Sequence, residues 1–205
     1  MTNDEKCEKC GYTHLFKEVC VTAKRKVCLG SALPPVHPQH LKVMTDYDNW
    51  QLVDLYVDHP QVLKMDATQL QYPDNFLEHI YASHLLEHLS HRDIPSILKH
   101  WYTKLKPGGL LTLNVPDLAW AARQILKYEN GQLLDSSVYT DFFGKSGLNN
   151  VIYGTHEHAG EYHKAGFTQS SLREILEMAQ FTEIVVDCIY DGHDMGVLFS
   201  TALKK

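Results

Sequence analysis

Short apolar segments recur along the chain, and a stretch with helical spacing separates the last two of them. Segments of strand composition lie at about residues 24–30, 50–56, 62–66, 76–82 and 110–115. Before the last of them, apolar residues at 94, 97, 98, 101 and 105 repeat with the period of a helix. Strands that alternate with helices predict an α/β sandwich, in which helices cover both faces of a mainly parallel sheet.

Two features predict how the second half of the chain continues. Lys106-Pro107-Gly108-Gly109 has the composition of a turn before the strand at 110–115, and residues 118–128 have helical composition. Thr168 or Ser170 can cap a helix at 171–179. Strands at 181–190 and 195–203 then flank Asp191-Gly192-His193-Asp194, which is a hairpin signal. We therefore expect the sheet to end in an antiparallel hairpin.

Composition excludes several classes of protein. The formal net charge is -6, which argues against a broad nucleic-acid-binding surface. No apolar run approaches the roughly 20 residues of a membrane span, and the polar amino terminus resembles neither a secretory signal nor a transit peptide. The five cysteines are an odd number and do not form a disulfide pattern. A cytoplasmic protein with reduced cysteines is the simplest interpretation.

The chain divides into a tail and one domain. Residues 1–23 form a Cys-containing appendage, and residues 24–205 form the domain, with an irregular segment at about 130–167. Cys7, Cys10, His14 and Cys20 could close a tetrahedral zinc site. Because the second half of this spacing is loose, we prefer a flexible reduced tail. Its removal is expected to leave ligand affinity intact.

Polar residues follow the predicted strands where each strand ends. In sheets of this class, ligands bind outside the carboxyl ends of the strands, near the point where strand order reverses. The residues at these positions are Gly30, Ser31, Asp54, Asp66, Ser83 and His84. Carboxylates on neighbouring strand ends suit a ligand with ribose hydroxyls and a nucleobase amine, because charge-assisted hydrogen bonds are strong.

Histidines gather in two places. The run from His84 to His88 has the order His-Leu-Leu-Glu-His, which differs from the His-Glu-x-x-His of zinc proteases, so we predict no metal there. His156, His158 and His163 crowd the irregular segment. A histidine there can deprotonate a hydroxyl near neutral pH, and the alternative is a solvated loop.

The chain resembles a known family in four stretches that follow one another. They are "VCLGS", "LVDLY", "KMDATQLQYPDNFLEHIYASHLLEHL" and "LKPGGLLTLNVPDL". In this order they resemble class I S-adenosylmethionine-dependent methyltransferases, and most closely the small methyltransferases associated with sugar and cell-surface polysaccharide pathways. The resemblance covers about residues 25–190 and is most specific over 66–117. It implies a Rossmann-like methyltransferase sandwich and S-adenosyl-L-methionine as cofactor.

The resemblance also implies roles for individual residues. Gly30 and Ser31 would lie by the methionine part of the cofactor, and Asp54 by the ribose hydroxyls. Asp66 and Ala67 would lie near the adenine amine. Ser83 and His84 would lie near the amino-acid end of the cofactor and the reacting methyl group.

Two departures from the family pattern qualify these roles. The family usually has Gly-x-Gly after an acidic residue, whereas this chain has Gly30-Ser31-Ala32 and carries Cys28 at the acidic position. A Cβ at Ala32 makes close approach of a cofactor less comfortable. The spacing from Gly30 to Asp54 is also long, so Asp46 or Asp48 is an alternative ribose ligand.

The sequence thus predicts a transferase that methylates a small or sugar-linked acceptor at oxygen, in polysaccharide biosynthesis. His84, His163 or His156 would be the catalytic base. The alternative is an inactive methyltransferase-like protein that binds a nucleotide-like ligand or a protein partner. A zinc-assisted nucleic-acid modifier is a weaker third hypothesis, which the acidic net charge opposes. The pattern specifies neither the exact acceptor nor the number of subunits.

Overall fold

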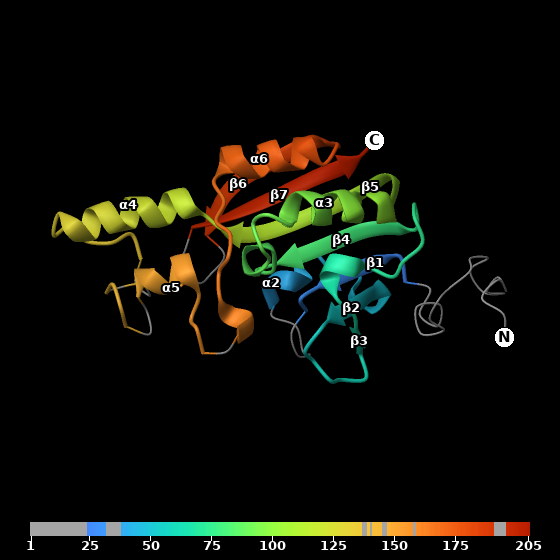
Figure 1. The fold of residues 1–205 in the computed structure, drawn as a ribbon, viewed down its shortest axis with the longest axis horizontal. Helices are drawn as coiled ribbons and strands as arrows, with labels where there is room; N and C mark the ends of the chain where they lie inside the picture. Colours follow the sequence, from blue (N-terminus) through green and yellow to red (C-terminus); the bar gives the residue numbers. More distant parts are fainter. Residues whose placement is uncertain are drawn as a thin grey trace.

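The chain forms an α/β sandwich around one sheet (Figure 1). The computed structural model describes residues 24–31, 38–136, 139, 141–144, 147–157, 159–190 and 196–205. The strands are β1 (Lys26–Leu29), β2 (Trp50–Asp54), β3 (Val62–Lys64), β4 (Leu77–Ser83), β5 (Leu105–Pro116), β6 (Phe181–Tyr190) and β7 (Gly196–Lys204). The helices are α2 (Pro38–Leu41), α3 (Ile94–Lys104), α4 (Leu118–Glu129), α5 (Leu148–Tyr153) and α6 (Gln169–Met178). Short 3-10 turns are η1 (Tyr47–Asn49), η2 (Ala67–Gln69), η3 (Leu86–His88) and η4 (Ala159–Glu161).

The order of the strands creates a point of reversal at the centre of the sheet. In the described residues the order is β3-β2-β1-β4-β5-β7-β6. Strands β1 to β5 are parallel, and β7 pairs antiparallel with both β5 and β6. From β1 the chain proceeds outward to β2 and β3, and then returns to β4 on the other side of β1. The predicted fold class, with its closing antiparallel pair, is confirmed.

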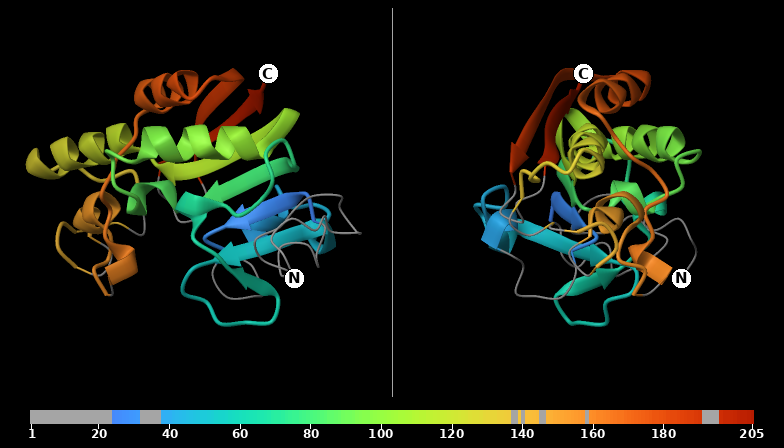
Figure 2. Two further views of the ribbon diagram at one scale, coloured as in Figure 1. Left: turned by 45° about the vertical axis from the view of Figure 1, so that its right-hand side comes forward. Right: turned by 90° about the vertical axis from the view of Figure 1, so that its left-hand side faces the viewer.

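Alternation along the strands separates the core into two faces. Val27 and Leu29 of β1 belong to the large cluster that packs under α3 and α6, whereas Cys28 between them belongs to a cluster with Met44 and Trp50. Successive side chains of a strand point to opposite faces, which explains this division. Figure 2 shows α3 and α6 on one side of the sheet and α2 on the other. Helices therefore cover both faces, as the sequence predicts.

Helix α4 and the segment after it form a third core. Trp120 and Ala121 pack with Leu148 and Val151 of α5 and with Val197 of β7. The next residue of β7, Leu198, belongs to the large cluster, so Val197 faces the opposite side of the sheet. This packing holds α5, which belongs to the predicted irregular segment, beside the carboxyl end of β5.

Strand β5 begins earlier than the sequence predicts. The expected turn at 106–109 lies inside β5. Leu77 of β4 pairs with Leu105, and His79 pairs with Leu110, so the residues between Leu105 and Leu110 are accommodated by a shift in register. Gly108 has φ 73°, a left-handed conformation that glycine adopts without a Cβ clash. The Pro-Gly-Gly sequence thus makes an irregularity within a strand. Residues 85–89 have helical composition, but only Leu86–His88 are helical there, in the short turn η3.

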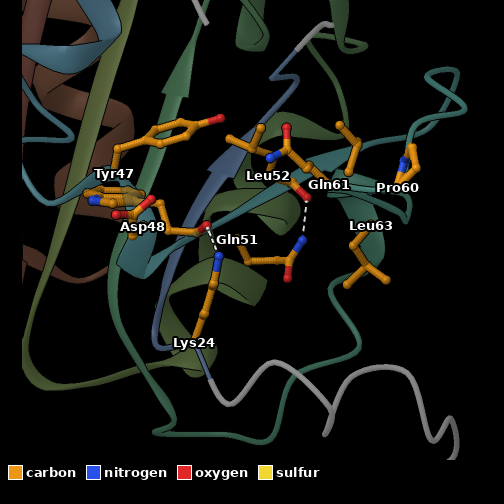
Figure 3. Close-up of a pocket in the computed structure, with 10 residues that line it drawn as sticks. Lys24, Tyr47, Asp48, Gln51, Leu52, Pro60, Gln61 and Leu63 are labelled. Carbon is orange, nitrogen blue, oxygen red and sulfur yellow. Dashed lines mark hydrogen bonds between the residues drawn. The ribbon is translucent and has the colours of Figure 1, made fainter. Parts of the chain in front are cut away.

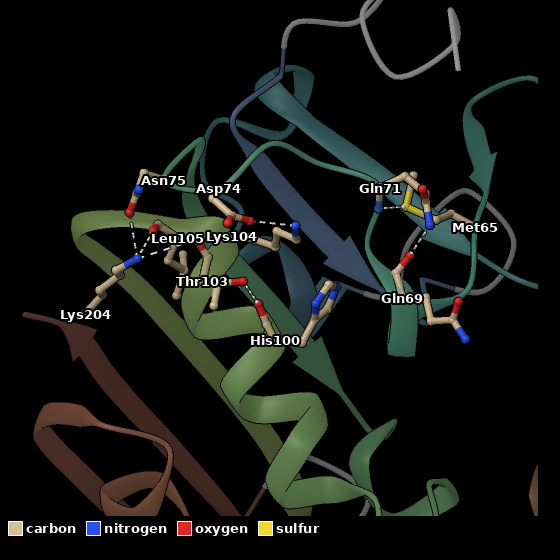
Figure 4. A network of polar contacts seen from close by, with 10 residues as sticks. All are labelled: Met65, Gln69, Gln71, Asp74, Asn75, His100, Thr103, Lys104, Leu105 and Lys204. Carbon is tan, nitrogen blue, oxygen red and sulfur yellow. Dashed lines mark hydrogen bonds and ion pairs between the residues drawn. The ribbon is translucent and has the colours of Figure 1, made fainter. Parts of the chain in front are cut away.

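Lysine side chains form ion pairs and hydrogen bonds at the amino edge of the sheet (Figure 4). Lys104 lies 2.7 Å from Asp74, and Lys204 Nζ donates to Asn75 Oδ1 at 2.8 Å and to the Leu105 carbonyl at 2.8 Å. These bonds join the end of β7 to the turn before β4 and to the start of β5. They fix the edge of the sheet opposite the strand ends where a ligand is expected.

Several predictions concern residues outside the described ranges. They are the tail with Cys7, Cys10, His14 and Cys20, the loop residue Ala32, His158, and the turn at 191–194. Among the described helices, none combines the length and apolar character needed to cross a membrane.

Candidate active site

The chain leaves β1 in a left-handed turn at the carboxyl edge of the sheet. Gly30 has φ 63°, and its N–H donates to the Val53 carbonyl of β2 at 2.9 Å. A Cβ at Gly30 would lie 3.1 Å from Leu85 Cδ1, in the turn after β4. Ser31, which is buried, donates its N–H to the same carbonyl at 3.3 Å. Glycine is therefore needed here both for its backbone conformation and for the close approach of Leu85.

Asp54 ends β2, and its carboxylate is held by the loop that follows. Its Oδ1 accepts from the backbone N–H groups of Tyr56 at 2.8 Å and Val57 at 3.2 Å. Burial, with a further contribution from Asp54, raises the pKa of the Cys28 thiol to about 12. Cys28 is thus a neutral core residue, and the acidic group near the first loop is Asp54.

Asp66 and Ala67 lie just after β3. Asp66 Oδ1 accepts from both the N–H and the hydroxyl of Thr68 at 2.8 Å and thereby caps the short turn η2. The Ala67 carbonyl accepts from Trp101 Nε1 of α3 at 2.7 Å. The Met65 N–H donates to the Asp54 carbonyl at 3.1 Å, which ties the two acidic strand ends together.

Strand β4 ends in a strained turn. His84 has φ 49°, a left-handed conformation that is uncommon for a residue with a side chain. Its N–H donates to the Asn114 carbonyl of β5 at 2.9 Å, and Asn114 Nδ2 donates to Ser83 Oγ at 3.3 Å. Such conformations cluster at functional sites, where the surrounding structure holds them in place.

His84 pairs with a buried glutamate one turn later. His84 Nδ1 lies 3.2 Å from Glu87 Oε1, and Glu87 is 1% exposed. Burial acts to raise the pKa of Glu87, but the hydrogen bond from His84 and the charges of His84 and His88 outweigh it, so the net shift is downward. Since an ionised carboxylate only accepts hydrogen bonds, His84 Nδ1 is the donor, and in the neutral ring Nε2 carries the lone pair.

A distant segment of the chain packs directly on this turn. The Glu87 carbonyl accepts from the N–H groups of Lys164 at 2.7 Å and Ala165 at 3.1 Å. His88 Nδ1 lies 3.3 Å from the Tyr162 carbonyl, and the rings of His88 and His163 are 4.9 Å apart. These contacts bring the histidines after β4 together with a histidine of the irregular segment.

A cavity of about 230 Å³ opens between the two segments. It is lined by His84, Glu87, His88, Pro116, Tyr139, Asn150, Val151, Gly154, Thr155, Glu161 and His163. Burial lowers the pKa of His163, and the negative charge of the nearby Glu87 offsets part of this decrease. The cavity thus has a histidine–carboxylate pair on one wall, and hydroxyl, amide and carboxylate side chains around it.

The structure brings together only part of the predicted catalytic set. His84 and His163 both line the cavity. His156 is exposed and is not among the described residues that line it; its Nε2 lies 2.8 Å from the Tyr153 carbonyl. The sequence interpretation gave Glu87 and His88 no role in the site and did not decode the part played by Asn150, Thr155 and Glu161. Glu87 and His88 follow His84 by three and four residues, and this short spacing was the signal in the sequence that could have placed them in the site.

The alternative ribose ligands lie at the wrong edge of the sheet. Asp46 bonds Lys26 at 2.5 Å and Trp50 Nε1 at 2.9 Å, and these partners begin β1 and β2. Asp48 lines a separate cavity of about 290 Å³ beside the first residues of β2 (Figure 3). Of the acidic candidates, Asp54 is the one that ends β2 at the carboxyl edge.

The described residues fit S-adenosylmethionine at the ends of β1, β2 and β3. Asp54 and Asp66 place two carboxylates on neighbouring strand ends, where ribose hydroxyls and an adenine amine need acceptors. The Gly30 turn lies between them and the turn after β4. The site therefore has acceptors at one end and the His84–Glu87 pair at the other.

The chain is similar to known methyltransferases in part of its sequence and in its fold. Residues 38–113 match the family model of a methyltransferase domain. The 1,6-didemethyltoxoflavin-N1-methyltransferase of Burkholderia thailandensis has a similar structure, with a TM-score of 0.56 and 16% identity over 89% of this chain and 72% of that one. A SAM-dependent methyltransferase from Archaeoglobus fulgidus has a TM-score of 0.56 and 13% identity over 88% and 86%. Phosphoethanolamine N-methyltransferase 2 of Haemonchus contortus has a TM-score of 0.53 and 14% identity over 88% and 48%.

No curated protein matched the chain by sequence. At these identities, the solved structures show a common fold. The methyltransferase-domain match, together with that fold, supports a SAM-dependent methyltransferase with S-adenosylmethionine as its cofactor.

Proposed function

We propose that the chain methylates a hydroxyl oxygen of a small or sugar-linked acceptor. The observation that carries the proposal is that the carboxyl edge of one sheet joins the cofactor-type residues Gly30, Asp54 and Asp66 to a cavity containing the His84–Glu87 pair. A donor and an acceptor held on the same edge can be aligned for an in-line displacement, in which alignment supplies much of the rate.

The chain's own residues hold the cofactor and orient the donor. Asp54 would accept hydrogen bonds from the ribose hydroxyls, and Asp66 and Ala67 would hold the adenine end. Gly30 and Ser31 would hold the methionine part, together with Ser83 at the end of β4. When bound, S-adenosylmethionine supplies an electrophilic methyl group on a sulfonium.

His84 is the proposed base. Glu87 holds its Nδ1–H, which orients the ring and stabilises the imidazolium that forms when Nε2 takes a proton. The acceptor oxygen would lose its proton to Nε2 of His84, and bound S-adenosylmethionine would supply the methyl group that this oxygen receives. Thr155, Asn150 and Glu161 of the cavity wall are available to bind other polar groups of the acceptor.

The proposed acceptor, the methylated atom and the pathway are inferred from the sequence. Methylation at oxygen, the sugar-linked acceptor and a role in polysaccharide biosynthesis rest on the resemblance described above. The polar cavity wall is compatible with a hydroxylated acceptor. The proposed cytoplasmic location rests on the cysteine pattern.

The first test is calorimetric titration with S-adenosylhomocysteine of the wild type, Asp54→Ala and Asp46→Asn. Loss of two charge-assisted hydrogen bonds should weaken binding to Asp54→Ala by about 100-fold or more. Asp46→Asn, at the opposite edge, is the matched control and should bind like the wild type. Equal binding by Asp54→Ala and the wild type would remove Asp54 from the site.

Methyl transfer itself requires a second measurement. Radiolabelled methyl transfer to a panel of hydroxylated acceptors, including sugar-linked ones, should yield labelled product. Binding of S-adenosylhomocysteine without transfer to any acceptor would favour the inactive alternative. Absence of binding by the wild type would contradict the proposal as a whole.

A further inference from the structure

Three side chains with metal-binding chemistry meet at the cavity. Glu87, His88 and His163 each offer one ligand atom, and these atoms lie within 4.8 Å of one another. All three residues also line the cavity. Donors bound to one ion at tetrahedral angles are about 3.4 Å apart, so small side-chain rotations would complete the set.

Both histidines are held in the way that metal ligands are held. His88 Nδ1 lies 3.3 Å from the Tyr162 carbonyl, and His163 Nδ1 lies 3.1 Å from the Val151 carbonyl. Because a carbonyl oxygen only accepts, each Nδ1 carries the hydrogen, and each neutral ring keeps its lone pair on Nε2. A backbone carbonyl that fixes the tautomer is the usual second partner of a metal-bound histidine.

The glutamate supplies an independent observation. Glu87 is 1% exposed, and its Oε1 is occupied by His84. Its Oε2 is buried and has no hydrogen-bond partner among the described residues. A buried carboxylate oxygen without a partner is costly, and native proteins usually satisfy such atoms with a protein group, a water or an ion.

We propose that Glu87, His88 and His163 bind one divalent transition-metal ion, with zinc as the best match. Two imidazoles and one carboxylate are a donor set of catalytic zinc sites, which keep a fourth position for water or substrate. That position can bind an oxygen of the acceptor and hold it near His84. This role rests on the proposed function, whereas metal binding itself rests on the three donors.

The sequence interpretation predicted no metal here. The His-Leu-Leu-Glu-His run has only two histidines and the wrong order for a zinc protease. The third ligand, His163, comes from the segment that packs on the turn through Lys164 and Ala165. A local motif cannot include a ligand supplied by such a distant part of the chain.

Cobalt titration of the full-length chain tests the proposal. The chain carries Cys7→Ser and Cys10→Ser, so that thiolates of the tail cannot dominate binding. We expect one Co²⁺ per chain, with a visible spectrum of nitrogen and oxygen ligands and no thiolate charge-transfer band. Calorimetry with Zn²⁺ on the same protein gives the affinity.

Three further variants locate the ion. His163→Ala and Glu87→Gln should each bind at least about 100-fold more weakly. His91→Ala is the matched control, because His91 Nδ1 also lies 3.3 Å from a backbone carbonyl, that of Lys164, yet His91 is not part of the cluster. Glu87→Gln preserves the shape of the side chain, so it keeps the test valid if His163→Ala does not fold.

The outcomes separate this proposal from the proposed function. Unchanged metal affinity in Glu87→Gln and His163→Ala, or no bound metal in the Cys7→Ser/Cys10→Ser chain, would overturn the site. S-adenosylhomocysteine titrated into His163→Ala should bind as it does to the wild type, because His163 is not among the residues proposed to hold the cofactor. If the metal binds at these residues but S-adenosylhomocysteine does not bind the wild type, the site stands and the methyl-transfer role fails.

Discussion

The two edges of the sheet use charged residues differently. At the amino edge, carboxylates pair with lysines, as in Lys26–Asp46, Lys104–Asp74 and Lys106–Glu78. At the carboxyl edge, the buried Glu87 pairs with a histidine, and its second oxygen has no hydrogen-bond partner among the residues that the structure describes.

The difference shows which edge is built for chemistry. Exposed lysine–carboxylate pairs add little stability and bind no ligand, because solvent screens them and their atoms already have partners. A histidine held by a buried carboxylate can instead exchange a proton or bind an ion near neutral pH. Turnover should therefore respond to changes at the carboxyl edge and not to changes at the amino edge.

Replacing His84 should have the largest effect. His84→Asn removes the proposed base, and turnover should fall by about 10² to 10⁴-fold, the range typical of general base catalysis. Asparagine tolerates the left-handed conformation of this residue, so folding should be preserved. Turnover and S-adenosylhomocysteine affinity are the measurements, with His156→Ala as the control that keeps wild-type turnover. Wild-type turnover in His84→Asn would refute its role as base.

Protonation of His79 at the amino edge should change stability and leave turnover chemistry untouched. Burial, with a further contribution from Lys26, lowers the pKa of His79 to about 4, and its Nε2 lies 2.8 Å from Thr112 Oγ1. The unfolded chain binds a proton on His79 more tightly than the folded chain does. Neutral His79 therefore contributes its full share to the free energy of unfolding above about pH 6.5. The free energy of unfolding then falls as the pH decreases from 6.5 toward 4, and the loss due to His79 is about 3 kcal/mol at most.

Urea unfolding of the wild type and His79→Gln between pH 7 and pH 4 measures this contribution. The free energy of unfolding should fall more steeply with decreasing pH in the wild type than in His79→Gln. Exposed His91, changed to Gln, provides the control and should keep the wild-type slope. Parallel slopes in the wild type and His79→Gln would show that His79 titrates alike in both states.

Replacing Gly30 should have the smallest of these effects. Gly30→Ala adds a Cβ in a left-handed residue and places it 3.1 Å from Leu85, so we expect a loss of about 1–2 kcal/mol in stability. Gly131→Ala is a matched control, since Gly131 has φ 65° but no atom within 4 Å of an added Cβ. The two variants share the backbone cost, and only Gly30→Ala should also weaken S-adenosylhomocysteine binding. Equal affinities would separate the Gly30 turn from the cofactor site.

Local pattern accounts for much of what the sequence predicted correctly. Thr168 caps α6 and forms a capping box with Ser171, because a threonine ahead of an apolar periodic segment satisfies the first free N–H groups. Asp54 and Asp66 follow their strands directly, so the alternation of strands and helices is enough to place both at one edge of the sheet. Each of these inferences needs only neighbouring residues.

The errors arose where a local signal competed with packing. Pro107-Gly108-Gly109 has the composition of a turn, but pairing with β4 accommodates it as an irregularity inside β5. Leu85 to Leu89 has helical composition, yet η3 ends after His88, where the Glu87 carbonyl and the His88 side chain bond the incoming 162–165 segment. His156 and His163 are close in sequence, but only His163 reaches the cavity.

The sequence by itself determined the α/β class and the residues that end the strands, because these follow from hydrophobic period and from the turn residues after each strand. Only the tertiary structure decided that His163 meets Glu87 and His88. That meeting depends on the bonds from Lys164 and Ala165 to the Glu87 carbonyl and on the packing of α4, α5 and β7. Contacts between segments so far apart in the chain have no periodic pattern in the sequence, so only the fold shows which residues line this cavity together.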